Sequence, residues 1–183
     1  NQTLILGVHG KYSSNSYHRL YQELPFEATT DEDEKAMSFQ LSAIYNYFMQ
    51  KHSLSIEMFH YHDIWNANYS GNCELWQHLW KGESLAFFSY NFMVSKRLSL
   101  KTRIGLDWLQ YHLYGDNNFS QLSPRINTNV QYQLKNGMLL WSFNFVNSNH
   151  GMDVINRAMI QVNSHMMEKG MPELKKSHDI NTY

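Results

Sequence analysis

The segment from Pro124 to Ser148 carries the strongest structural signal in the sequence, because it alternates apolar and polar residues in two successive arms. In the first arm, apolar residues and one threonine occupy every second position from 126 to 134, with amide residues between them and Arg125 before them. Successive side chains of a strand point to opposite faces, so this period of two gives one apolar and one polar face. Lys135-Asn136-Gly137 separates the arms, and Asn-Gly at such a place is the strongest short-range hairpin signal, because both residues tolerate a positive φ. The segment therefore predicts a β-hairpin.

The same period of two recurs along most of the chain. It predicts strands over residues 3–12, 37–47, 53–65, 86–92 and 98–113, over both arms of the hairpin, and near Ile180, which makes about eight strands. Short turns at 50–52, 94–97 and 135–137 are expected to alternate with long polar loops at 13–35, 66–83, 115–123 and 147–176. The acidic run from Asp31 to Glu34 is expected at a solvated loop tip.

Composition excludes several classes of protein. The 183 residues have a formal net charge of -1, so no basic surface for nucleic acid is indicated. Mean hydropathy is -0.53, and no apolar run approaches the roughly 20 residues of a spanning helix, which excludes a helical membrane protein. A membrane β-barrel is compatible with this hydropathy, because half of each of its strands is polar. The single cysteine, Cys73, allows no internal disulfide.

The sorting of connections by length favours a membrane barrel, because such barrels have short turns at one rim and long loops at the other. We therefore expect an all-β, antiparallel up-and-down meander that is part of a transmembrane β-barrel, with apolar faces toward lipid and polar faces toward a lumen. Aromatic residues are expected to form a girdle at each rim. Those beside the short turns are Tyr45, Tyr47, Tyr90, Phe92, Tyr132 and Trp141, and those at the opposite strand ends are Trp65, Trp108, Tyr111 and Tyr114. A soluble all-β domain that buries these rings is disfavoured by the many charged and amide residues on the opposite face.

The expected faces can be stated by residue. One set should share the apolar face: Phe39, Leu41, Phe88, Ile104, Val130 and Phe143. The other set should share the polar face: Ser38, Gln40, Arg103, Asn127 and Gln131. Charges expected to line the lumen are Lys101, Arg103, Asp107 and Arg125. On the lipid side, each Arg or Lys at mid-membrane would cost about 2–4 kcal/mol, so the polar side is the only suitable place for them.

Few residue patterns point to chemistry. Nucleophile elbows, phosphate loops and zinc-ligand spacings are missing from the sequence, and we expect neither an enzyme nor a cofactor. His60 and His62 share a strand face, but a metal would need a third ligand from elsewhere, and a pair of strand-end histidines is the simpler interpretation. Trp76 and Trp80 lie in a stretch whose spacing predicts a helical turn within a loop. They are candidates to stack on a sugar or another planar ligand, with packing of the loop onto the rim as the alternative.

The segment Gly170-Met171-Pro172-Glu173-Leu174-Lys175-Lys176-Ser177 precedes the last alternating strand. It resembles the Gly-Asn-Pro-x-Leu-Lys-Pro-Glu segment of TonB-dependent receptor barrels, in which a long outer loop re-enters a strand. Gly170, Pro172, Leu174 and Lys175 match, whereas Met171 and Lys176 depart from the pattern. The resemblance implies a location in the outer membrane of a Gram-negative-type cell, within a barrel of about 22 strands. It also implies contact with outer-membrane lipid, with a plug domain of the same full-length chain, with TonB and with an imported ligand.

We expect residues 1–183 to be an internal part of such a barrel, with the plug domain and the remaining strands outside this sequence and both edge strands unpaired. The leading hypothesis is the barrel wall of an outer-membrane, TonB-dependent receptor that imports a ligand. The alternative is a passive porin- or adhesin-like barrel without energy coupling. A soluble β-barrel that binds a small apolar ligand is a third class, and the polar face argues against it.

Overall fold

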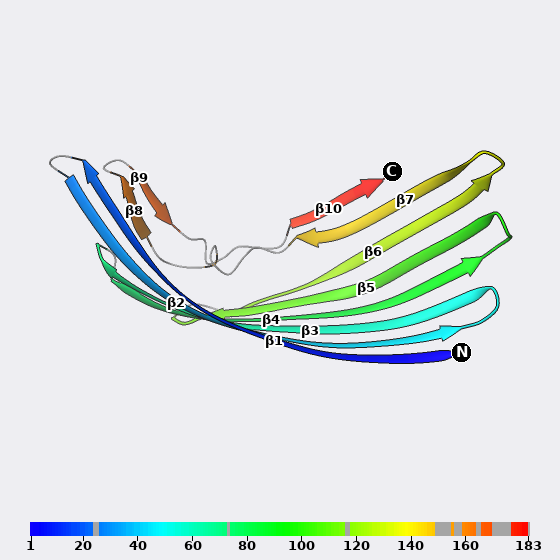
Figure 1. The fold of residues 1–183 in the computed structure, drawn as a ribbon, viewed down its shortest axis with the longest axis horizontal. Helices are drawn as coiled ribbons and strands as arrows, with labels where there is room; N and C mark the ends of the chain where they lie inside the picture. The colour runs from blue at the N-terminus through cyan, green and yellow to red at the C-terminus, as the bar shows by residue number, and fades with distance from the viewer. Residues whose placement is uncertain are drawn as a thin grey trace.

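A computed structural model describes residues 1–23, 26–72, 74–115, 118–148, 155, 159–163, 166–169 and 177–182. These residues form one eight-stranded antiparallel sheet and one two-stranded sheet (Figure 1). The strands of the large sheet are β1 (Gln2–Glu23), β2 (Phe26–Phe48), β3 (His52–Gly71), β4 (Leu75–Met93), β5 (Leu98–Leu113), β6 (Asn118–Leu134), β7 (Gly137–Ser148) and β10 (Ser177–Thr182). The small sheet pairs β8 (Met159–Asn163) with β9 (Met166–Lys169).

The expected all-β antiparallel meander is confirmed. The large sheet has the order β1-β2-β3-β4-β5-β6-β7-β10, so each strand pairs with its neighbours in sequence except where β8 and β9 intervene. The sheet is open: within the described part of the chain, β1 pairs only with β2, and β10 pairs only with β7. The same part of the chain contains no helix that is long and apolar enough to cross a membrane.

Cross-strand register assigns each residue to a face, because directly opposite residues of antiparallel strands point the same way. One such row crosses six strands through Tyr45, Ile56, Phe88, Ile104, Ile126 and Phe145. Both expected sets of face residues are confirmed by this register, with Phe39 and its set on one face and Arg103 and its set on the other.

The sheet is bent into a trough, and β8 and β9 lie on its inner side (Figure 1). Ile155, which precedes β8, packs against Trp65, Leu79 and Tyr111, all of which belong to the polar set by register. We therefore call the face that carries Arg103 the concave face and the face that carries Ile104 the convex face. Convex apolar side chains are largely exposed, as shown by Leu6 at 71% and Val8 at 73%.

The convex face has a continuous apolar band, which covers residues 4–12, 37–47, 54–64, 80–92, 98–108, 122–132 and 139–145 of the seven strands β1 to β7. Convex positions in these ranges include no Asp, Glu, Lys or Arg. Their polar members are His60, His62, Ser84, Thr102 and Thr128. The band is therefore free of formal charge apart from any protonation of the two histidines.

The ends of the strands are arranged as expected, but the long loops are not. Turns after Phe48, Met93 and Leu134 lie at one end of the sheet, and the opposite ends of the hairpins lie at the other (Figure 1). The loops expected at 13–35 and 66–83 are wrong, because β1 and β2 stay paired to Glu23 and Phe26, and β3 and β4 to Tyr69 and Leu75. In these segments both faces carry polar residues, so the contrast that reveals a strand disappears while the backbone pairing continues. Strand β6 also begins at Asn118, inside the loop expected at 115–123.

One further local expectation is wrong, and the expected hairpin is confirmed. The helical turn expected around Trp76 and Trp80 is part of strand β4, in which both rings lie on the convex face. The hairpin of β6 and β7 is present, but neither Asn136 nor Gly137 takes a positive φ. The hairpin thus forms across a short connection, and it does not use the positive φ that an Asn-Gly pair allows.

The expected aromatic sets differ in how they are placed on the sheet. Register places all the rings beside the short turns on the convex face, including Tyr90 and Trp141. In the other expected girdle, Trp108 lies on the convex face, but Trp65 and Tyr111 are 3% and 2% exposed on the concave face. These two rings belong to the small core that contains Ile155, because their position numbers differ by an odd number from those of the convex residues of their strands.

Gly105 allows close packing in the middle of the concave face. A Cβ atom at this position would meet Phe87 Cδ1 at 2.3 Å and the carbonyl oxygen of Ala86 at 2.5 Å. We expect Gly105→Ala to destabilise the sheet by about 1–3 kcal/mol, because the ring and the strand must both move. Urea unfolding measures the change. Gly10→Ala is the matched control, because nothing lies within 4 Å of its new Cβ, and equal losses for the two variants would contradict this account.

Candidate functional site on the concave face

The four charges expected to line a lumen all lie on the concave face. Lys101 and Arg103 of β5 stand opposite Asn129 and Asn127 of β6, Asp107 stands opposite Ser123, and Arg125 opposite Gly105. Successive concave positions of one strand are two residues apart, so these charges form a ladder along β5 and β6.

Arg103 is held by Glu57 and Phe87, and Ser89 in turn fixes Glu57. Its guanidinium forms an ion pair with Glu57 Oε2 at 2.5 Å and lies 3.8 Å from the centroid of the Phe87 ring. Ser89 Oγ donates a hydrogen bond to the other oxygen of Glu57 at 3.2 Å. The Phe87 ring also covers the backbone of Gly105, so the missing side chain of the glycine makes room for the ring that supports the arginine.

Arg125 connects two carboxylates. It forms an ion pair with Asp107, which is fully buried, and its Nη2 lies 3.7 Å from Glu83 Oε1. A buried carboxylate is tolerated only when a cation or several donors compensate its lost hydration. Lys81 is a further cation of the concave face, and its Nζ lies 4.0 Å from Asp63 Oδ2.

The sequence analysis named Asp107 but missed the other acidic partners of these cations. Glu57 occupies a polar position in the alternation of β3, so the alternation places it on the polar face. The alternation does not show that its ion-pair partner is Arg103. Glu83 was assigned to a loop because the alternation of β4 is weak before Leu85. Cross-strand register, which brings Glu57 near Arg103 from two strands away, is the information that the sequence does not state.

Amides continue the polar surface across β6 and β7. Asn127 donates to Asn144, Asn129 Nδ2 donates to Asn127 Oδ1 at 2.7 Å, and Ser142 Oγ donates to Asn129 Oδ1 at 2.7 Å. Asn144 Nδ2 in turn donates to Ser142 Oγ at 3.2 Å. This network uses part of the hydrogen-bonding capacity of each amide and leaves the rest available to water or another chain.

A polar hollow of about 280 Å³ lies on the concave face near the short turns. Its polar lining includes Asn46, Ser55, Ser89 and Lys101 besides the Glu57–Arg103 pair. Lys101 is exposed and has no ion pair with any residue that the structure describes. The hollow therefore offers a free ammonium group and several neutral hydrogen-bonding groups to a polar partner.

An acidic cluster lies on the concave face beyond the apolar band. Glu32, 5% exposed, forms an ion pair with Arg19 at 3.2 Å and accepts a hydrogen bond from Tyr69. Burial and then the hydrogen bond and charge of nearby Glu32 raise the pKa of Glu34 above its ordinary value. Burial and the same Glu32 carboxylate raise the pKa of Tyr69, which keeps its hydroxyl protonated as a donor.

The remaining candidate residues lie elsewhere. Trp76 and Trp80 are on the convex face, Trp76 is 53% exposed, and neither joins the concave charges. His60 and His62 are on the convex face too, where His60 Nδ1 lies 2.9 Å from Ser84 Oγ. The residues that the structure describes include no group of three or more His, Cys, Asp or Glu placed to hold a metal. The motif residues Gly170, Pro172, Leu174 and Lys175 lie outside the described residues.

Replacing Arg125 should lower the free energy of unfolding. In Arg125→Met the buried Asp107 loses its cation, and we expect a loss of about 3 kcal/mol in the free energy of unfolding. Lys101→Met is the control, because an exposed lysine with no described ion pair should change stability by less than about 0.5 kcal/mol. Urea unfolding measures both changes in stability. Adding Asp107→Asn to the Arg125 variant should recover part of the loss, and no recovery would argue against the ion pair as its cause.

The acidic cluster should give a pH-dependent stability. Because the folded state raises the pKa of Glu34 above 4.5, its contribution is fully favourable below 4.5 and is lost as the pH rises through the raised value. Glu34→Gln should therefore be more stable than the parent chain at neutral pH, and the difference should vanish in acid. Urea midpoints at the two pH values test this. The exposed Glu74 provides the control Glu74→Gln, and an equal gain in that variant would contradict the role of the cluster.

Comparison with known proteins adds no family to this description. No protein-family model matches the chain, and neither a curated protein nor a solved structure matches it. The interpretation of its function therefore rests on the residues and geometry described above.

Proposed function

We propose that the chain forms part of the wall of a transmembrane β-barrel in an outer membrane, in a receptor of the TonB-dependent type that imports a ligand. One observation carries this proposal: the apolar band has no Asp, Glu, Lys or Arg on its convex side, whereas the concave side of the same residue ranges is rich in them. The concave charges are Lys11, Glu57, Asp63, Lys81, Glu83, Lys101, Arg103, Asp107 and Arg125.

The height of the apolar band suits a bilayer. On β2 it runs from Met37 to Tyr47. With about 3.3 Å per residue and a strand tilt of about 40°, this length rises about 25 Å along the membrane normal. The apolar belt of outer-membrane barrels has about the same height. The exposed convex side chains, which would be unfavourable in water, then contact lipid.

The open edges support a barrel wider than eight strands. Among the residues that the structure describes, strand β1 pairs on one side only along Gln2–Glu23, and a membrane-spanning sheet must pair both edges. A closed barrel of about eight strands is filled by its own side chains, whereas wider barrels hold a channel or a plug. The concave ion pairs, the amide network and the polar hollow with Lys101 supply the polar lining that a plug domain or water would contact.

The receptor type, rather than a passive pore, is supported by the resemblance of Gly170, Pro172, Leu174 and Lys175 to the loop segment of TonB-dependent barrels. In this proposal the wall residues contact a plug domain on the concave side and outer-membrane lipid on the convex side. Import energy comes through TonB, and the identity of the ligand is left open.

Cysteine labelling in membranes tests the wall. Leu41→Cys and Ile104→Cys, on the convex band, should resist a membrane-impermeant maleimide, because lipid covers them. Gln40→Cys and Ser99→Cys, on the concave face, should react or should become reactive when a plug domain is removed. Cys73 is first replaced by serine so that only the introduced thiols report. Equal labelling of the two sets in intact membranes would contradict a transmembrane wall.

Conductance separates the receptor from the porin alternative. The full-length protein in a planar bilayer should be closed if a plug fills the barrel, and it should conduct only after the plug is deleted or unfolded by denaturant. Steady conductance of the intact protein would favour a passive porin and overturn the receptor assignment while leaving the membrane wall in place.

A further inference from the structure

Two polar rows cross β1 to β4 on the convex face, immediately beyond the apolar band. The outer row contains Ser16, Asp33, Asn68 and Trp76, which are direct partners in register. The inner row contains Ser14, Lys35, Asn66 and His78. The next row toward the short turns is apolar and consists of Tyr12, Met37, Ile64 and Trp80. A polar surface and the apolar band therefore meet within one row spacing.

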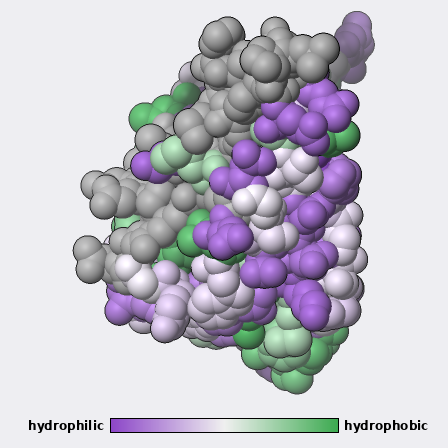
Figure 2. Space-filling view, turned by 90° about the vertical axis from the view of Figure 1, so that its left-hand side faces the viewer, coloured by the Kyte–Doolittle hydropathy of each residue, from purple (hydrophilic) through white to green (hydrophobic). Residues whose placement is uncertain are grey.

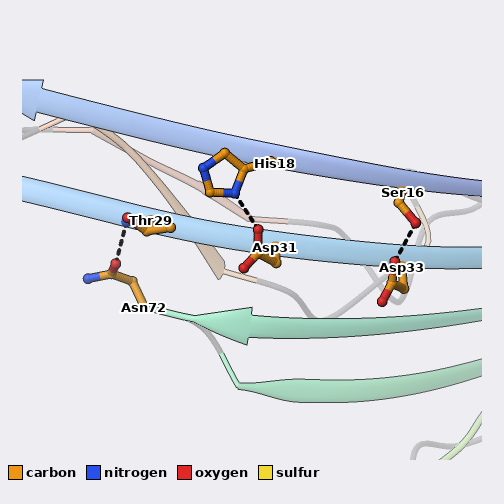
Figure 3. Close-up of polar contacts among 6 residues, drawn as sticks. All are labelled: Ser16, His18, Thr29, Asp31, Asp33 and Asn72. Atoms are coloured by element: carbon orange, nitrogen blue, oxygen red, sulfur yellow. Dashed lines mark hydrogen bonds and ion pairs between the residues drawn. The ribbon is translucent and has the colours of Figure 1, made fainter.

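The two polar rows enclose a hollow of about 480 Å³, within the size range of small-molecule sites. Ser16 Oγ donates to Asp33 Oδ1 at 2.5 Å, which fixes the carboxylate, and His18 forms a similar pair with Asp31 in the next row (Figure 3). Asn66 Oδ1 lies 2.6 Å from His78 Nδ1, so the Asn66 amide nitrogen is left to donate elsewhere. The exposed side chains of Asn68 and Lys35 add a neutral amide and an ammonium group.

Trp76 forms one wall of this hollow. Its indole is 53% exposed, stacks on His78 with an interplanar angle of 9°, and meets the edge of Tyr114. A rigid, half-exposed indole beside carboxylate and amide groups matches the chemistry of a sugar ring, which has an apolar C–H face and a rim of hydroxyl groups. The indole covers the C–H face, and Asp33, Asn66 and Asn68 accept or donate at the rim. Seen from this end, many of the coloured residues are hydrophilic, and a group of hydrophobic residues lies at the lower edge (Figure 2).

We propose that this hollow binds the sugar headgroup of a glycolipid in the membrane that surrounds the barrel. The position of the hollow selects a glycolipid over a free sugar, because acyl chains joined to a sugar on Trp76 would run over Met37, Ile64 and Trp80 on the same face. One ligand then satisfies both the polar rows and the apolar row beside them. This inference rests on the proposed membrane wall, since it requires lipid against the convex band.

Fluorine NMR of the chain labelled with 5-fluorotryptophan tests the site in phosphatidylcholine vesicles. The five tryptophans include Trp76 at the hollow, Trp108 within the band and Trp141 near the short turns, and Trp76→Phe assigns the first resonance. Titration with a diglucosyl diacylglycerol should shift the Trp76 resonance to saturation and leave the equally exposed Trp141 unchanged. Diacylglycerol without sugar should have no effect.

Variants and a second lipid make the outcome decisive. Asn66→Ala and Asn68→Ala should each raise the glycolipid fraction needed for half-saturation about tenfold, whereas Asn91→Ala, an exposed amide on the concave face, should not. A nitroxide on the acyl chain of the vesicle lipid should broaden the Trp108 resonance. If Trp108 broadens but Trp76 ignores the glycolipid, this inference fails and the membrane wall stands. An equal shift with maltose overturns the choice of a glycolipid, and an unbroadened Trp108 overturns both proposals.

Discussion

Cross-strand register is the constraint on which the rest of this structure depends. Side chains alternate with a period of two, so a slip of one residue would exchange the faces of a whole strand. A slip of β5 would carry Lys101, Arg103 and Asp107 from the concave face to the convex face, among Ile56, Phe88 and their neighbours. The charge-free band and the concave ion pairs are thus two consequences of one alignment. Both the band and the ion pairs disfavour an alignment that is shifted by one residue.

The concave network is largely satisfied by the wall itself. Asp107 already has a cation from the adjacent strand, Glu57 and Glu83 have cations from two strands away, and the amides of β6 and β7 bond to one another. Whatever fills the trough therefore meets a surface whose groups are fixed in place beforehand, which limits the entropy lost on contact. Lys101 differs from its neighbours in being exposed beside the hollow near the short turns. Specific contact with a partner would concentrate there rather than on the paired charges.

The sequence was sufficient to predict the parts of the strands that carry the apolar band, and it was insufficient for the parts that extend beyond the band. Between Met37 and Tyr47 hydropathy alternates strongly, because one face must be apolar, and the strand is evident. Between Ser13 and Glu23 the two faces are both polar, and the pairing depends on backbone bonds and contacts such as Ser16–Asp33 that alternation does not record. Trp65 and Tyr111 show a related limit: ring type suggested an interface, but parity along the strand placed both in a core. For the candidate site, the sequence identified the four charged residues, but most of their ion-pair partners can be identified only from the cross-strand register.

The unequal lengths of the strands have a geometric consequence. β1 and β2 continue roughly ten residues past the apolar band, whereas β6 and β7 end soon after it. At about 3.3 Å per residue, the tall side rises some 30 Å along the strand direction. In a barrel oriented as proposed, the part of the rim formed by the described strands would slope, from high over β1 and β2 to low at the end of β7. A large molecule diffusing toward the trough would be turned away on the high side and admitted on the low one, so the wall also sets a direction of approach.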